Sequence, residues 1–231
     1  MISEMPIPSE SDSIRFEKLS KSEMRDILFL RSFIKNTNEI QCRIMDNKRK
    51  HLNYRYIATL NKMLAKLNLF VFGIEDQQVE GNHSSSVIKK CAGEAPIPSR
   101  QMILRDYCVL DTLIKICFLP LRLHNIALTT RTQTMVTLKQ TMSLTYDCLR
   151  HSIAEYRPNE LYASQWLGLM IEDTFKNNSN VLEKAEQTLK ELIDNNERIL
   201  NKRINKETID QFLVFLARVD TFNPRTRTAS I

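Results

Sequence analysis

The sequence predicts an all-α protein of about seven helices joined by short connections. Its 231 residues include only 4 glycines. Sheet-rich folds need many tight turns, and turns with positive φ favour Gly or Asn. Apolar residues also recur every three or four positions through much of the chain, which is the period of a helix with one buried face. A hydrophobic fraction of 42% supplies a core of ordinary size.

The first two helices are predicted between residues 20 and 73, after a flexible segment at 1–19. Ser20 and Glu23 have the spacing of a capping box, in which each side chain bonds the backbone N–H of the other residue. Apolar residues of the first helix then follow: Met24, Ile27, Leu28 and Ile34. The second helix has a more regular stripe: Ile57, Leu60, Leu64, Leu67 and Val71. Gly73 is placed to end this helix.

An insertion and a third helix follow. Residues 74–98 have no apolar period and contain three consecutive serines, so they are predicted to be mobile and exposed. Ser99 is placed to cap one continuous helix that Pro120 closes. The apolar face of this helix is predicted to contain Ile103, Tyr107, Leu110, Ile114 and Cys117.

The second half of the chain is predicted to contain four helices. A loop near 121–131 precedes a helix carrying Met135, Leu138, Met142 and Leu149. Pro158 suits the first turn of the next helix, whose apolar side contains Tyr162, Trp166, Leu169 and Met170. Asn180 and Glu183 can form a capping box at the start of a helix with the apolar residues Leu182, Ala185, Leu189 and Leu192. The last helix presents Ile209, Phe212, Leu213, Leu216 and Val219. The predicted domain therefore covers residues 20–222, and a tail follows at 223–231. The sequence shows no exact repeat. Degenerate helical repeats hide their period, however, so a solenoid built from them stays a possible architecture.

Charge, cysteines and apolar runs limit the classes of partner. The net charge is +6, but 33 basic and 27 acidic residues are well mixed. The basic cluster KRKHLNYR, Lys48 to Arg55, is typical of a solvated helix end, so nucleic acid is not predicted as a partner. Five cysteines without a CxxC pair indicate reduced thiols of a cytosolic protein. The first 25 residues lack a signal-peptide core, and VLDTLIKICFLPL is too short to cross a bilayer, so this segment is expected to make no membrane contact.

The sequence does not predict an enzyme. It has no P-loop, GxGxxG, HExxH or GxSxG pattern, and no Cys/His cluster with metal spacing. The four histidines are far apart in sequence, so His151 is assigned a structural or surface role. No catalytic residue, metal site or cofactor is predicted.

Three residues instead form a candidate anion-binding pattern. Arg105 lies two positions after Ile103, about 200° around a helix axis, so it should point away from the core, on the face of Gln101, Met102 and Cys108. An outward Arg near a helix N-terminus can hold phosphate together with free N–H groups. Arg157 stands beside another predicted helix start, and Tyr156 can donate its hydroxyl to a phosphate oxygen. The alternative is an ordinary surface arginine with a packed tyrosine.

Several segments resemble the cytosolic helical domain of inositol 1,4,5-trisphosphate receptors, the homology domain shared with ryanodine receptors. The resemblance is carried by EMRDILFLRSFIK, LNKMLAKLNLFVFG, SRQMILRDYCVLDTLIKICFLPL, LRHSIAEYRPNELYASQWLG and ELIDNNERILNKRINKETIDQFLVFLAR. They occur in the family's order across most of residues 22–222. The RHS…YR pattern is closer to the inositol trisphosphate receptors than to the ryanodine receptors.

The resemblance implies an armadillo-like helical bundle or solenoid that forms one wall of a ligand cleft, with a β-trefoil domain as the other wall. It implies that Arg105, Tyr156 and Arg157 contact an inositol phosphate. Other domains or subunits of a calcium-release channel would be the protein partners. The location would be the cytosolic face of the endoplasmic reticulum membrane within a receptor, and the cytoplasm otherwise.

The sequence departs from the family at three positions that the family keeps basic, where this chain has Pro98, Met102 and Pro158. Each charge-assisted hydrogen bond to phosphate contributes on the order of 1.5–3 kcal/mol, so ligand binding by this chain alone is expected to be weak or lost. The alternative function is an armadillo-like scaffold for protein–protein interaction without ligand binding.

Overall fold

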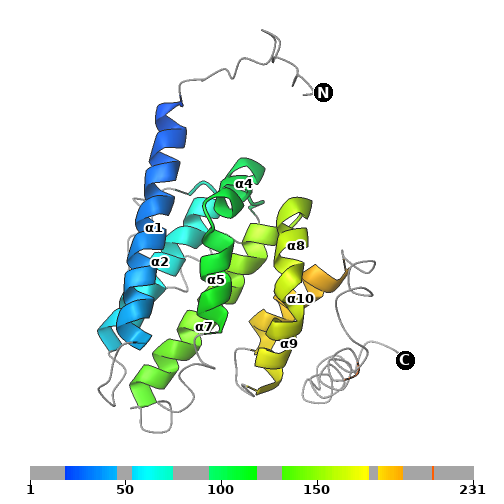
Figure 1. Ribbon diagram of the computed structural model, residues 1–231. Coiled ribbons are helices and arrows are strands. Elements are labelled where there is room, and N and C mark those ends of the chain that lie inside the picture. Colours follow the sequence, from blue (N-terminus) through cyan, green and yellow to red (C-terminus); the bar gives the residue numbers. More distant parts are fainter. Residues whose placement is uncertain are drawn as a thin grey trace, which may run out of the picture.

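The computed structural model describes residues 19–45, 54–74, 94–118, 132–176 and 182–194, together with residue 210. Within these ranges every regular element is a helix (Figure 1), which confirms the all-α prediction. The elements are α1 (Lys21–Met45), α2 (Tyr54–Val71), α4 (Pro98–Asp106), α5 (Val109–Cys117), α7 (Thr132–Ile153), α8 (Arg157–Ala163), the 3-10 helix η3 (Ser164–Trp166), α9 (Leu167–Lys176) and α10 (Leu182–Asp194).

The helices stack in pairs around α7. α2, α5 and α10 all pack against α7, while α1 contacts both α2 and α5, and α9 contacts α10. In Figure 1 these contacts appear as a front row of α1, α5 and α8–α9 that covers a back row of α2, α7 and α10. Stacked helix pairs of this kind are the building pattern of helical solenoids.

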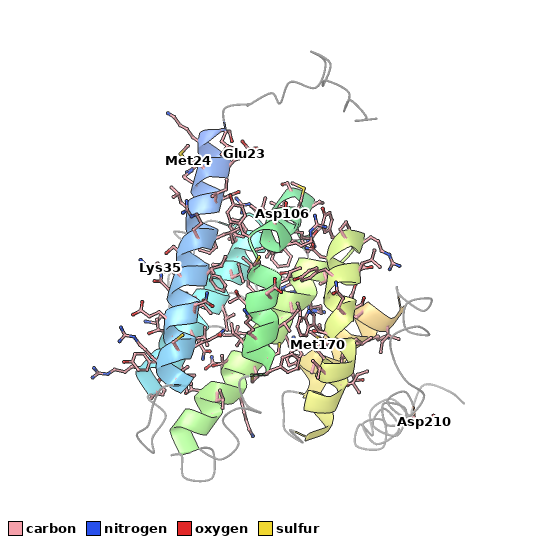
Figure 2. The ribbon with its side chains drawn as sticks, viewed as in Figure 1. Glu23, Met24, Lys35, Asp106, Met170 and Asp210 are labelled. Atoms are coloured by element: carbon pink, nitrogen blue, oxygen red, sulfur yellow. The ribbon has the colours of Figure 1, made fainter. Side chains whose placement is uncertain are left out.

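The start of α1 matches its predicted cap, and two of its four predicted apolar residues, Ile27 and Ile34, are partly buried. Ser20 N donates to Glu23 Oε2 at 2.8 Å, and Glu23 N donates to Ser20 Oγ at 3.1 Å, which confirms the capping box. Met24 and Leu28, however, are 51% and 57% exposed. The buried stripe is Leu30, Phe33, Thr37, Ile40 and Ile44. Figure 2 explains the error, because Met24 lies at the end of α1 that projects beyond its neighbours.

The predicted stripe of α2 is confirmed in full. All five of its residues are buried: Ile57, Leu60, Leu64, Leu67 and Val71. Gly73 ends the helix with a φ of 75°. Its N–H bonds Phe70 O and the N–H of Ile74 bonds Leu69 O, each at 3.0 Å, which is the Schellman pattern that favours glycine at this position. A Cβ on Gly73 would lie 2.6 Å from Ile97 Cδ1.

The predicted continuous helix from Ser99 to Pro120 is wrong. The chain breaks at Tyr107 and Cys108, and Cys108 adopts a left-handed conformation with a φ of 56°. The first part, α4, begins two residues earlier than predicted, with Ile97 as its N-cap in place of Ser99 and Pro98 in its first turn. The break directs α4 toward α8 and α5 toward α7. Left-handed backbone disfavours residues other than Gly, so packing on both sides must stabilise this turn.

The last residues assigned to the 74–98 insertion belong to the helical domain. Ile97 N donates to Val71 O at 3.0 Å, and Pro98 starts α4. Residues 75–93 lie outside the described part of the chain. So do most of the basic cluster at 48–55, the capping residue Asn180 and the predicted last helix apart from Asp210.

The second half follows its prediction more closely. Leu138, Met142 and Leu149 of α7 are buried, as are Ala185, Leu189 and Leu192 of α10. Pro158 stands in the first turn of α8, as predicted. The helix after it is divided by η3. In the following α9, Met170 is buried and its neighbour Leu169 is exposed.

Candidate functional site

The candidate site begins at the turn between α7 and α8, where Tyr156 precedes Arg157 and Pro158. Glu155 turns the chain with a φ of 57°, and Tyr156 N donates to Ile153 O at 3.0 Å. Tyr156 is the N-cap of α8 through its backbone, since its carbonyl accepts from the N–H groups of Asn159 at 3.0 Å and Glu160 at 3.2 Å. The half-buried Tyr156 side chain plays no capping role.

Two buried amides fix α4 against this turn. Gln101 Nε2 donates to the carbonyls of His151 and Ala154, both at 2.9 Å. Asn159 Nδ2 donates to Gln101 O at 2.7 Å and to Ser152 O at 2.8 Å. The last carbonyls of a helix have no partner within the helix. Gln101 and Asn159 therefore satisfy the end of α7 and, in the same contacts, join α4, α7 and α8.

These amides correct the sequence prediction for the face of α4. Gln101 was expected beside Arg105 on the outward face, but it is buried, with 1% of its surface exposed. Asn159 was not identified at all. Neither residue belongs to an apolar period that would predict its burial. The one feature of the sequence that could have indicated their role is a side-chain amide close to a helix end.

His151 extends the buried network toward α2. Its Nδ1 lies 3.0 Å from Asn68 Oδ1, its Nε2 lies 3.2 Å from Arg150 Nη2, and Phe72 contacts its ring edge-on at 4.8 Å between centroids. Burial, reinforced by the charges of Arg150 and Lys184, lowers the pKa of His151 to about 4. The imidazole is therefore neutral near pH 7, with Nδ1–H donating to Asn68 and Nε2 accepting from Arg150. This is the structural role expected from the sequence.

Arg105 is partly exposed, but it lies in the last turn of α4, not near a helix N-terminus. The sequence interpretation assumed one long helix, and the break at Cys108 changes the position of Arg105 within it. The end of α4 presents carbonyls and not N–H groups, so α4 supplies no backbone donors beside Arg105. The Arg105 guanidinium donates to Asp106 Oδ1 through Nε at 3.3 Å and Nη2 at 3.2 Å.

Arg157 is half exposed and also paired with a carboxylate. Its Nη1 lies 3.2 Å from Glu160 Oε2, and the Glu160 side chain is almost fully buried. The two candidate cations are thus each matched by one acid, Asp106 for Arg105 and Glu160 for Arg157. A bound anion would have to compete with both carboxylates.

The structure places the three predicted site residues on two adjoining elements. α4 contacts α8 directly, and the end of α7 meets both. In Figure 1 α4 and the start of α8 lie at the same end of the helical stack, and Figure 2 labels Asp106 there, next to Arg105 in sequence. Met102, at a position that the sequence resemblance implies to be basic, is exposed on α4, and Pro98 and Pro158 are exposed in the first turns of their helices.

Within the described residues, no group of three or more His, Cys, Asp or Glu side chains is arranged to hold a metal ion. None of the described helices combines the length and apolar character needed to cross a bilayer.

Comparison with protein families gives one match over most of the chain. A model of the RIH domain, the homology domain of ryanodine and inositol 1,4,5-trisphosphate receptors, matches residues 61–225. The match begins within α2 and includes every later described helix, together with Arg105, Tyr156 and Arg157.

Proposed function

We propose that this chain, which belongs to the RIH domain family of inositol trisphosphate and ryanodine receptors, forms one helical wall of an inositol-phosphate cleft and transmits ligand occupancy. Arg105, Tyr156 and Arg157 would contact the anion. The response would be a rigid-body movement of the helical wall, one of the ways in which receptors couple binding to a distant change.

The observation that carries this proposal is the amide lock at Gln101 and Asn159. It fixes the helix of Arg105 against the turn that holds Tyr156 and Arg157, through four hydrogen bonds of 2.7 to 2.9 Å. A ligand that bridges α4 and α8 would therefore meet a preorganised surface. Preorganisation reduces the entropy that binding would otherwise cost.

The same surface explains why binding by this chain alone should be weak. Asp106 and Glu160 neutralise the two arginines locally. The exposed Met102 adds no charge to the outward side of α4, and the two prolines add none to the helix starts. By the family resemblance, the second wall of the cleft would come from a β-trefoil domain. Neighbouring domains or subunits of a calcium-release channel, at the cytosolic face of the endoplasmic reticulum, are the proposed setting.

Calorimetric titration of the chain with inositol 1,4,5-trisphosphate at low salt tests the proposal. We expect weak binding that the double variant Arg105→Ala/Arg157→Ala abolishes. The matched control is Arg31→Ala/Lys35→Ala, which also removes two positive charges, but from the exposed side of α1. Equal heats from the wild type and the Arg105/Arg157 variant would show that the ligand binds elsewhere.

A gain-of-binding variant sharpens the same experiment. Met102→Lys adds a cation one turn before Arg105 and should tighten binding by about tenfold or more, since a charge-assisted hydrogen bond contributes roughly 1.5–3 kcal/mol. Met24→Lys makes the same substitution on the exposed end of α1 and should leave the affinity unchanged.

A scaffold for protein–protein interaction is the second candidate function. It is favoured by the local pairing of both arginines with acids and by the three uncharged positions. Absence of heat from the wild type and from Met102→Lys, with cooperative unfolding of both, would support this function over the first.

A further inference from the structure

A separate cleft of about 430 Å³ lies between the N-terminal half of α1, the end of α2 and the start of α4. Its lining combines charged and apolar side chains: Arg25, Asp26, Phe29, Lys66, Phe70 and Arg100. It does not include Arg105, Tyr156 or Arg157. The side chains of Arg100 and Arg105 point in directions about 140° apart around the axis of α4, because successive residues of a helix are about 100° apart.

The apolar part of the cleft is built from two aromatic rings. Phe29 of α1 and Phe70 of α2 stack at 5.0 Å between centroids, with an angle of 24° between the ring planes. Phe70 is buried, and Phe29 is only partly buried, so part of the stack is accessible from the cleft. Leu69 and Ile74 add aliphatic surface to the lining.

Arg100 is held rigidly at the edge of these rings. Its guanidinium carbon lies 4.6 Å from the centroid of Phe70, and Nη1 donates to Phe70 O at 2.7 Å. Nη2 donates to Asp26 Oδ1 at 3.3 Å, and Nε lies 3.3 Å from Asp26 Oδ2. Each terminal nitrogen of a guanidinium carries two N–H groups. Within the described residues, each therefore has one N–H beyond its bond to Phe70 or Asp26 with which it can donate to a further acceptor.

The charge of the cleft is positive. Among the described residues that line it, Arg25, Lys66 and Arg100 are basic and Asp26 is acidic, so these lining residues carry a net charge of +2. Asp26 already bonds Arg100.

We propose that this cleft binds a short acidic segment of a partner protein, in which a carboxylate stands next to an aromatic or large aliphatic side chain. The carboxylate would lie between Arg25, Lys66 and the remaining N–H groups of Arg100. The apolar side chain would pack on Phe29 and Ile74. A free, fully hydrated phosphate would satisfy the cations but would leave the apolar half of the lining without a partner, so the peptide is the better match.

Fluorescence anisotropy with labelled heptapeptides tests this proposal on the full chain. One peptide set contains Asp and Glu beside a Phe or Leu in a Ser/Gly background, and a matched set has Asn and Gln in place of the acids. We expect the acidic set to bind and Lys66→Glu to weaken it by about tenfold or more. Lys62→Glu, on an exposed position of the same helix outside the lining, should change the affinity less than about twofold.

Arg25→Glu and its control Arg31→Glu form a second pair on α1, which guards against a variant that fails to fold. The proposal fails if no acidic peptide binds the wild type, or if the neutral set binds equally well. Equal losses from the cleft variants and their controls would also overturn it, because they would indicate a response to net charge only. Displacement of the peptide by inorganic phosphate at similar concentration would assign the cleft to free anions.

Discussion

The contact between α2 and α7 and the contact of α4 with the α7–α8 turn are held together by different interactions. The α2–α7 contact is mainly apolar, with Leu60, Leu64 and Leu67 of α2 and Leu144 and Leu149 of α7 buried, although His151 of α7 also bonds Asn68 of α2. The α4 contact is mainly polar, because the buried amides of Gln101 and Asn159 bond backbone carbonyls of neighbouring helices.

This difference determines how each contact responds to change. Burial of apolar surface is non-directional and roughly proportional to area, so one methyl group more or less changes the free energy gradually. A buried hydrogen bond depends on direction, and a buried carbonyl that loses its donor costs the full desolvation of that group. We therefore expect the α2–α7 contact to contribute more to stability and the α4 contact to fix the orientation of the helices.

The largest effect is expected in the apolar contact. Leu64 is fully buried, so Leu64→Ala should lower the free energy of unfolding by about 3–4 kcal/mol through lost burial and a residual cavity. Urea unfolding followed by circular dichroism measures the change. Leu28→Ala on the exposed side of α1 is the control and should cost less than about 0.5 kcal/mol. Similar losses in the two variants would contradict the assignment of the core.

A somewhat smaller effect is expected when His151 is protonated. Its pKa is about 4 in the folded protein, below the ordinary 6.5, so the unfolded chain binds the proton more tightly. Stability should be complete above pH 6.5 and fall progressively toward pH 4, by at most roughly 3 kcal/mol. Urea unfolding at pH 4.5 to 7.5 measures this slope. His151→Gln should be less stable at pH 7.5 but show a flatter pH dependence, and an unchanged slope would assign the effect to other groups.

The smallest of the three effects is expected from one amide of the lock. Asn159→Ala removes the donor from two buried carbonyls and should cost about 2 kcal/mol. It should also weaken any binding that bridges α4 and α8, which loss of stability alone would not do under folded conditions. Asn36→Ala, which removes only an exposed bond to Ser32, is the control. Equal stability of the two variants would show that the lock is unimportant.

The sequence predicted the features that depend on local spacing. The Ser20–Glu23 box, the α2 stripe and the Gly73 terminus each rest on residues a few positions apart, and the structure confirms all three. The face of α1 could not be chosen in the same way, because apolar residues occur on two sides of it. The choice was made by tertiary packing, which buries Thr37 and leaves Leu28 exposed.

The candidate site was predicted less completely. The outward direction of Arg105 and Met102 follows from helical spacing, and both side chains are at least partly exposed. No Gly or Pro, the usual sequence marks of a helix end, stands at the break at Cys108. The position of Arg105 at the end of α4 could therefore not be predicted from the local sequence. Gln101 and Asn159 act between helices that are far apart in sequence, and their hydrogen bonds depend on the assembled fold.

The exposure of Met102 has a consequence for how such a domain can diverge. The amides that hold α4 and α8 together point inward, whereas Met102 points toward solvent. A point mutation at an exposed site away from buried contacts usually alters stability by less than about 0.5 kcal/mol. Selection can therefore add or remove charge at this position with little effect on folding, so the charge of this surface can change while the architecture persists.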